Sequence, residues 1–391
     1  MPGWLSLKYL DNQPYLRFFN TNRNVIQNDI WGELSSGLWK SFSVENYLYN
    51  DSVGEVNQHL WKQVVPNIYP INPGFVWDFS KNCLTAELYF PQLVDSSFDK
   101  FIGIVENYFK QFEGRKIGVH LSGGLDSSII ICLLHYLKIP FTPIGLVCKR
   151  FEFRTERHIQ EKLLEWGDNG RLIDIEQYPF WSNLLMNPKQ QLPDSNIMMN
   201  NASFALANAF HEAEVDVVIN GQGGDSLFYE AIPNRGFNIG NEFLNLWDEV
   251  NNYKPNHCEL YSFYADKQII NHIYSLRYGQ DHDPIKKWAR QFFKPILPFE
   301  LSDYYYKSDY FGIDKSGLSN ARHDIQILFE EAYDWLGHEI FSPMSIREFL
   351  SIEVNNLEYK TYCAYCSKIS IAVWLHSLFR NDEKSTNSIF R

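Results

Sequence analysis

Two glycine-rich segments hold the residues best suited to chemistry. The first, 120–128, reads His-Leu-Ser-Gly-Gly-Leu-Asp-Ser-Ser, and the second, 219–228, reads Ile-Asn-Gly-Gln-Gly-Gly-Asp-Ser-Leu-Phe. Paired glycines let the backbone turn tightly and let phosphate oxygens approach where a Cβ would be in the way. The N–H groups and the dipole at the start of a following helix attract an anion. The first segment therefore predicts a loop that holds the phosphates of a ligand, with serine hydroxyls as additional donors.

Each segment also contains an aspartate, Asp126 in the first and Asp225 in the second. A carboxylate beside a phosphate is repelled unless a divalent cation lies between them, so this pairing predicts Mg²⁺ bound by both acids. Neither segment is the GxxxxGK[ST] loop of ordinary nucleotide triphosphatases. Either segment alone would fit a purely structural turn. Two such turns, each directly after a predicted buried strand, favour a nucleotide site at one sheet edge.

The elements that position these loops alternate between strand and helix. Apolar strands are predicted at 117–121, 141–147, 171–175 and 215–219, and helices at 98–112, 125–137, 155–165 and 202–214. This order predicts an α/β fold, a mainly parallel sheet flanked by helices. Beyond residue 240 no further strand is predicted, and segments 324–335, 345–353 and 357–378 indicate a helical C-terminal part.

The first part of the chain has a different pattern. Short segments with β character, such as 75–79 and 84–90, are separated by prolines and glycines. We therefore predict a small β-rich domain at residues 1–95, a linker near 91–97, and a second domain at residues 96–391.

Composition narrows the class of protein. The net charge of −12 disfavours a nucleic-acid partner, because phosphates are repelled on average. No secretory signal and no apolar run long enough to span a membrane is found, and six scattered cysteines do not suggest a disulfide framework, so a cytoplasmic protein is expected. Cys363 and Cys366 have suggestive spacing but no second ligand pair, and Cys132 reads as core, so all three are interpreted as structural thiols.

The sequence SGGLDSS followed by GxGGD resembles the ATP-pyrophosphatase domain of asparagine synthetases and their relatives, β-lactam synthetase and the lasso-peptide macrolactam cyclases. The likeness covers about residues 98–360. It implies a fold of the adenine nucleotide α-hydrolase (PP-loop) type and cleavage of ATP to AMP and pyrophosphate. The substrate carboxylate would become an acyl-adenylate, which an amine then attacks.

By this resemblance, Leu121 and Ile144 border the adenine, and the two glycine loops hold the phosphates. The residues implied for ATP are Leu121, Ser122, Gly123, Gly124, Asp126, Ser127, Ile144, Gly221, Gln222, Gly223 and Gly224. The implied catalytic residues are Asp126, Asp225 and a late lysine, for which Lys360 is the first candidate and Lys368 the second. Pro193-Asp194 and the segment 341–344 also lie where family members have related segments.

The chain departs from asparagine synthetases at several positions. Gln222 stands where they have glutamate, Ser226 where they have an acid, and residues 229–231 replace a Gly-Gly-Tyr segment. GxGGD in this form is more similar to the lasso cyclases. Segment 65–74 resembles the final strands of a class II glutaminase, but position 2 is Pro2 where that enzyme needs a cysteine, so no glutaminase activity is predicted.

Three functions stay open at this point. The first is an amide ligase that closes a ring or joins two parts of a peptide or small metabolite, with a precursor peptide and a companion protease or subunit as expected partners. The second is amidation of a small carboxylate by free ammonia. The third is a synthetase-like binding partner without catalysis. Ligases that thiolate tRNA or form guanylate or NAD share the SGGxDS loop, but the acidic charge disfavours tRNA.

Overall fold

The computed structural model describes residues 91–187, 193, 197–229, 253, 258–280, 283, 285–303, 310–337, 341–354 and 357–386, together with six short strands in the first 90 residues. Its centre is a five-stranded sheet in the order β11-β10-β7-β8-β9, and every neighbouring pair is parallel. The strands are β7 (Ile117–His120), β8 (Thr142–Val147), β9 (Arg171–Asp174), β10 (Val217–Asn220) and β11 (Glu259–Ser262). The predicted α/β fold is confirmed.

The fifth strand, β11, corrects the sequence analysis, which predicted no strand beyond residue 240. It pairs with β10 at the sheet edge, and Leu260 and Ser262 are buried while Glu259 and Tyr261 are only partly so. Two of the four residues of β11 are polar, so this segment is too short and too polar to show the apolar pattern of a strand. Only pairing with a distant strand makes them part of the sheet.

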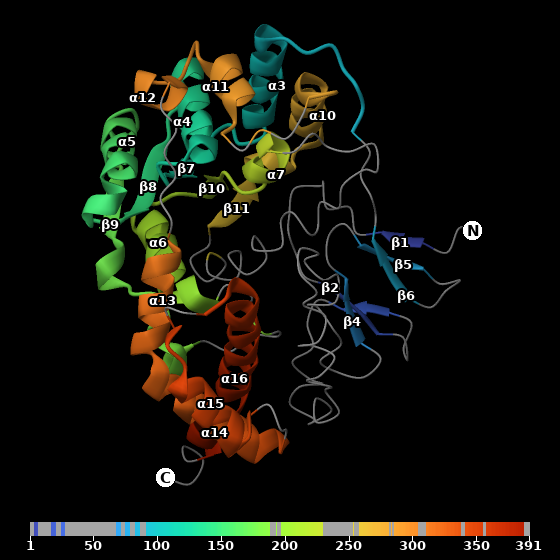
Figure 1. Cartoon of the computed structure of the whole chain (residues 1–391). Coiled ribbons are helices and arrows are strands. Elements are labelled where there is room, and N and C mark those ends of the chain that lie inside the picture. Colours follow the sequence, from blue (N-terminus) through green and yellow to red (C-terminus); the bar gives the residue numbers. More distant parts are fainter. Residues whose placement is uncertain are drawn as a thin grey trace.

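Helices cover both faces of this sheet. Figure 1 shows α4 (Leu125–Leu137) and α5 (Arg154–Leu164) on one face and α6 (Asn200–Glu212) on the other. Helix α4 has an unbroken apolar run at 129–134 because it is buried between the sheet and α3 (Phe98–Lys110). Within the described residues, no helix combines the length and apolar character needed to cross a membrane.

The remaining helices belong to two groups. Helices α7 (Gly224–Tyr229), α10 (Lys267–Arg277), α11 (Lys287–Phe293) and α12 (Phe299–Asp303) pack near the sheet. A second hydrophobic core joins α13 (Phe311–Asn320), α14 (Arg322–Leu336), α15 (Pro343–Ser351) and α16 (Tyr359–Thr386). The predicted helical C-terminal part is confirmed.

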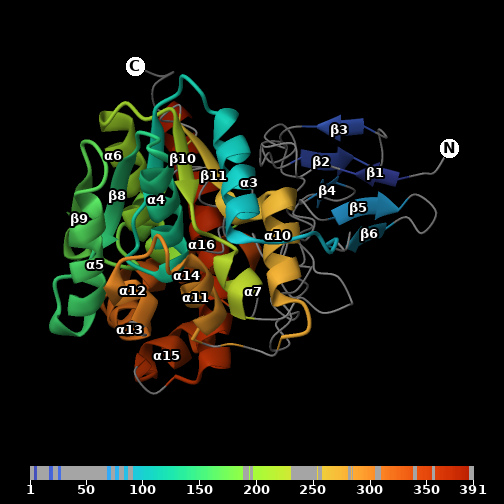
Figure 2. The same cartoon turned by 90° about the horizontal axis from the view of Figure 1, so that it is seen from above.

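The first 90 residues form two small antiparallel sheets, β1-β5-β6 and β3-β2-β4, as the β character of this part predicted. The strands are β1 (Trp4–Ser6), β2 (Arg17–Asn20), β3 (Val25–Gln27), β4 (Ile68–Ile71), β5 (Phe75–Asp78) and β6 (Cys83–Ala86). Figures 1 and 2 both show them to one side of the large sheet. The domain boundary near residue 95 stays a prediction.

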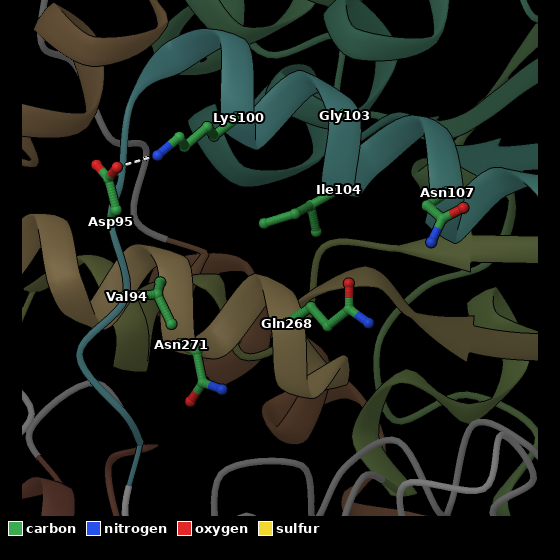
Figure 3. A pocket seen from close by; sticks show the side chains of 8 residues that line it. All are labelled: Val94, Asp95, Lys100, Gly103, Ile104, Asn107, Gln268 and Asn271. Carbon is green, nitrogen blue, oxygen red and sulfur yellow. Dashed lines mark hydrogen bonds and ion pairs between the residues drawn. The ribbon is translucent and has the colours of Figure 1, made fainter.

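The predicted linker is an extended segment, 91–97, that lies along α10. The backbone N–H of Gln92 donates to Asn271 Oδ1 at 2.9 Å, and that of Val94 donates to Ser275 Oγ at 2.8 Å. Figure 3 shows the pocket of about 440 Å³ that this segment forms with α3 and α10, with Asp95 paired to Lys100. Side chains of α10 thus accept hydrogen bonds from backbone N–H groups of this segment, which pairs with none of the described strands.

Gly145 in β8 lies against the backbone of Leu121, which leaves no space for a side chain. A Cβ built on Gly145 would lie 1.9 Å from the carbonyl oxygen of Leu121, a backbone atom that cannot rotate away. We expect Gly145→Ala to lower the free energy of unfolding by about 3 kcal/mol, at the upper end of the usual cost of overpacking. Thermal or urea unfolding of the purified chain measures this change.

Gly103 in α3 provides the matched control, because nothing lies within 4 Å of a Cβ built there. Gly103→Ala should keep or raise stability, by up to about 1 kcal/mol from helix propensity. Equal stability of the two variants would show that β8 does not approach Leu121 as closely as described.

Candidate active site

The two glycine loops follow neighbouring strands of the sheet. The first leaves β7 and the second leaves β10, and these strands pair in parallel with Val217 opposite Ile117. From β7 the chain goes through α4 towards β8, whereas from β10 it goes through α7 towards β11, on the other side. Strand order therefore reverses between β7 and β10. Such a reversal opens a crevice at the carboxyl ends of the strands, where ligands bind in open α/β sheets.

The loops also contact each other directly. A Cβ built on Gly221 would lie 2.8 Å from the backbone nitrogen of Ser127, and one built on Gly224 would lie 2.6 Å from Asp126 Cγ. Only glycine permits this approach of the second loop to the start of α4. The predicted meeting of the two loops at one sheet edge is therefore observed.

The first loop has the geometry of an anion site. Gly123 adopts φ +80°, a left-handed conformation, and a Cβ there would lie 2.8 Å from the carbonyl oxygen of Glu156. Gly124 is the N-cap of α4 and has no side chain to cap the helix. Ser122 Oγ lies 2.7 Å from Ser127 Oγ and accepts from the N–H of Gly124 at 3.2 Å. The loop thus gathers hydroxyls and a helix N-terminus at one point.

Asp126 and Asp225 converge on a lysine that the sequence analysis did not single out. Lys286 Nζ lies 2.6 Å and 2.8 Å from the two carboxylate oxygens of Asp126, and it also forms an ion pair with Asp225. The side chain of Lys286 is 6% exposed, that of Asp126 17% and that of Asp225 52%. The crevice therefore holds two carboxylates and one ammonium group within contact distance.

Burial and charge act in opposite directions on these groups. Burial raises the pKa of Asp126 to about 6, with Lys286 lowering it and Asp225 raising it further. Burial also disfavours the charge on Lys286, but the two carboxylates outweigh this and raise its pKa. The lysine is therefore held as a cation, and the carboxylates face it as charged acceptors.

The donor set fits a magnesium ion that is shared with a nucleotide. No group of three or more His, Cys, Asp or Glu side chains that could bind a metal alone occurs within the described part of the chain. Mg²⁺ in phosphate-transfer sites is commonly held by one or two carboxylates together with substrate phosphates. Two carboxylates that already converge on one cation, Lys286, match that arrangement.

Leu121 directly follows β7 and Ile144 lies in the middle of β8, and both side chains are fully buried. The N–H of Leu121 donates to the carbonyl of Ile144 at 2.9 Å. Their side chains therefore belong to the core, and their place beside the adenine stays a prediction. Gln160, a residue absent from the sequence prediction, is 2% exposed and donates through Nε2 to the carbonyls of Leu121 at 3.0 Å and Leu146 at 2.7 Å. It positions the start of the loop against β8.

Two side chains hold the second loop. The N–H of Gln222 donates to Asn220 Oδ1 at 3.3 Å, and Ser262 Oγ donates to the carbonyl of Gln222 at 2.7 Å. Gly223 adopts φ +82°, which explains the glycine there. Tyr264, just after β11, donates to the backbone carbonyl of Asp126 at 2.9 Å. The unpredicted strand β11 thus supports both loops.

Both lysine candidates from the sequence, Lys360 and Lys368, lie on the C-terminal helix α16. Lys368 Nζ is 5.3 Å from the centre of the Tyr365 ring. Burial lowers the pKa of Lys368. The side chain of Lys360 lies outside the described residues, so its role stays a prediction. The lysine that contacts the loop aspartates is Lys286, which sequence reasoning missed because Lys-Lys before a helix has no distinctive motif.

The structure also describes the cysteines and parts of the two further segments that the sequence analysis named. Cys132 is core, and Cys363 and Cys366 form no disulfide and are partly buried against the second hydrophobic core. Burial raises the pKa of Cys366, which makes it a poor nucleophile. Pro193 is buried, whereas Asp194 lies outside the described residues. Phe341 is fully buried in the second hydrophobic core, and Met344 is 78% exposed.

His120, directly before the first loop, predicts a pH effect on stability. Its Nε2 lies 2.5 Å from the hydroxyl of Tyr253, its ring stacks on Phe210, and burial lowers its pKa from 6.5 to about 4. The unfolded chain therefore binds a proton more readily, and stability falls as the pH drops from about 6.5 towards 4. We expect His120 to contribute about 2 kcal/mol to this fall, less than the full shift implies because the ring is partly exposed.

Urea unfolding of the wild type and of His120→Gln at pH 7 and pH 4.5 isolates this contribution. The variant should lose less stability between the two pH values. A loss equal to that of the wild type would show that the ring is not held neutral in the folded protein.

Comparison with known proteins gives one family match. Residues 111–301 match the model of the family described as asparagine synthase. This segment contains both glycine loops, Lys286 and all five strands of the large sheet. The match supports an ATP-dependent amide ligase in general. No curated protein gives a significant match to the chain.

Two solved structures are similar to the chain at low identity. One is NMN synthetase from Francisella tularensis, with 13% identity, a TM-score of 0.27, and coverage of 59% of this chain and 96% of that one. The other is NAD+ synthetase from Burkholderia pseudomallei, with 14% identity, a TM-score of 0.24, and coverage of 58% and 88%.

Proposed function

We propose that this chain is an ATP-dependent ligase that activates a substrate carboxylate as an acyl-adenylate, releases pyrophosphate, and forms an amide when an amine attacks. The observation that carries this proposal is the meeting of the two glycine loops at the point where strand order reverses. Gly221 and Gly224 bring the second loop against Ser127 and Asp126, and both loop aspartates contact the cation of Lys286.

Some residues of the site would bind the phosphates, and others would bind the metal ion or supply charge. Backbone N–H groups at the start of α4 and the hydroxyls of Ser122 and Ser127 would hold the pyrophosphate part of ATP. Asp126 and Asp225 would hold Mg²⁺, which supplies positive charge to the phosphates when bound. Lys286 would donate to the departing pyrophosphate. The chain supplies position and charge, and no protein nucleophile is required.

We propose a peptide or peptide-like natural product as the substrate and its own amine as the nucleophile, so that the product is a macrolactam. The GxGGD form of the second loop, with Gln222 and Ser226, is the feature that favours this class. Free ammonia as the nucleophile and a non-catalytic binding role are the alternatives.

Product analysis tests the proposal and separates these alternatives. The full chain is incubated with ATP, Mg²⁺ and a panel of linear peptides and small carboxylates, and nucleotide products are separated by chromatography. AMP with pyrophosphate supports adenylation, whereas ADP with phosphate contradicts it. Loss of one water from the peptide supports ring closure, and incorporation of labelled ammonia supports amidation. Absence of ATP binding by calorimetry would support the binding role and reject the ligase.

A further inference from the structure

Lys286 is an unusual neighbour for a pair of metal-binding carboxylates. Its ammonium group contacts both oxygens of Asp126 and one oxygen of Asp225, so it occupies the space between the two acids. A magnesium ion held by the same two carboxylates would need that space. The structure therefore places a cation of the protein itself where the divalent cation is expected.

The lysine is held firmly in this position. Its backbone is left-handed, with φ 53° and ψ 39°, at the N-cap of α11. Its N–H donates to the carbonyl of Asp283 at 3.0 Å, and its own carbonyl accepts from Arg290 at 3.0 Å. Its Nζ also lies 5.5 Å from the centre of the Phe228 ring. A buried side chain with these constraints keeps its ammonium group directed at the carboxylates.

We propose that Lys286 stands in for the divalent cation in the nucleotide-free protein, so that the metal enters the site only together with the phosphates of the nucleotide. The proposal rests on the proposed function for the identity of the nucleotide, but competition between the lysine and a metal for Asp126 and Asp225 can be tested without it.

The charges explain why the metal would need the nucleotide. The ammonium group halves the negative charge of the two carboxylates, to a net charge near −1. At short range it also repels a divalent cation that arrives alone. Nucleotide phosphates add negative charge and further oxygen ligands. They give Lys286 another anion to contact and complete the coordination that two carboxylates cannot supply. Ordered entry of this kind would keep the nucleotide-free site from retaining stray divalent ions.

The test measures Mn²⁺ binding to the full chain without nucleotide, through the electron paramagnetic resonance signal of free Mn²⁺, at pH 8. Lys286→Met removes the ammonium group and should bind Mn²⁺ at least about tenfold more tightly than the wild type. Lys287→Met is the matched control, since its side chain is exposed and adjacent, and it should bind like the wild type. Adding Asp225→Asn to Lys286→Met should remove the gain, which assigns the ion to the carboxylate pair.

Melting curves provide a second measurement, and Lys286→Gln a second variant in case the methionine variant folds poorly. Mn²⁺ should raise the melting temperature of either Lys286 variant and leave that of the wild type unchanged. Equal Mn²⁺ affinity of wild type and both variants would overturn the proposal. Failure of ATP to bind any of the proteins would instead reject the proposed function, while the metal result without nucleotide would still decide the role of Lys286.

Discussion

Asp126→Asn is expected to reduce ATP-dependent pyrophosphate release by about a thousandfold or more. Asparagine has the same shape but lacks the charge that a metal ion and Lys286 both require. The carboxylate lies in the first turn of α4, is contacted by Lys286 at 2.6 Å, and lies against Gly224 of the second loop. Its loss would remove one of the two carboxylates that contact Lys286. Pyrophosphate release at saturating ATP measures the effect.

The fold provides a close control for this substitution. Asp99 is the second residue of α3, as Asp126 is the second residue of α4, and both helices have 13 residues. Asp99 is exposed and far from the loops in sequence, so Asp99→Asn should keep full activity. Asp126→Asn should remain folded, because burial disfavours the charged carboxylate, as its raised pKa shows, and a neutral amide does not bear that cost. Near-normal release by a folded Asp126→Asn protein would refute the assigned role.

The sequence predicted those features that follow from local pattern. The strands before both loops are apolar and the glycines are adjacent, so a tight turn at a shared sheet edge could be inferred for Ser122–Ser127 and Gly221–Asp225 from the sequence alone. The buried helix α4 was also predictable, because its apolar run at 129–134 is continuous. Residues close in sequence set these features.

Features that depend on distant pairing could not be predicted in the same way. Lys286 meets Asp126 across 160 positions, and only the path of α10 and α11 past the sheet brings them together. Gln160 looks like an ordinary helix residue in α5, yet its amide donates to the carbonyls of Leu121, just after β7, and Leu146 in β8. The missed strand β11 has the same cause, since its pairing with β10 defines it. Single-sequence patterns contain little information on such contacts.

The contact between Lys286 and Asp126 also predicts a large loss of activity when the lysine is replaced. Lys286→Met is expected to lower kcat/KM for ATP by about a hundredfold or more, because a buried cation beside the phosphates is removed. Lys286→Arg keeps the positive charge but spreads it over a planar group, which replaces a compact ammonium between two carboxylates only in part. The arginine variant should therefore recover part of the activity, and Lys287→Met should keep all of it. Steady-state pyrophosphate release over a range of ATP concentrations measures these values.

The pattern across the variants separates a catalytic lysine from a structural one. If Lys286 only neutralised Asp126 and Asp225, Lys286→Met would lose stability while high Mg²⁺ restored its activity, since the metal could take over the neutralisation. If Lys286 contacts the departing pyrophosphate, the loss should persist at high Mg²⁺ and at saturating ATP, as a lower kcat. We expect the second outcome, because the ammonium group lies at the meeting point of both loops, in contact with Asp126 and Asp225. Full recovery by Mg²⁺ alone would limit Lys286 to a role in the nucleotide-free protein.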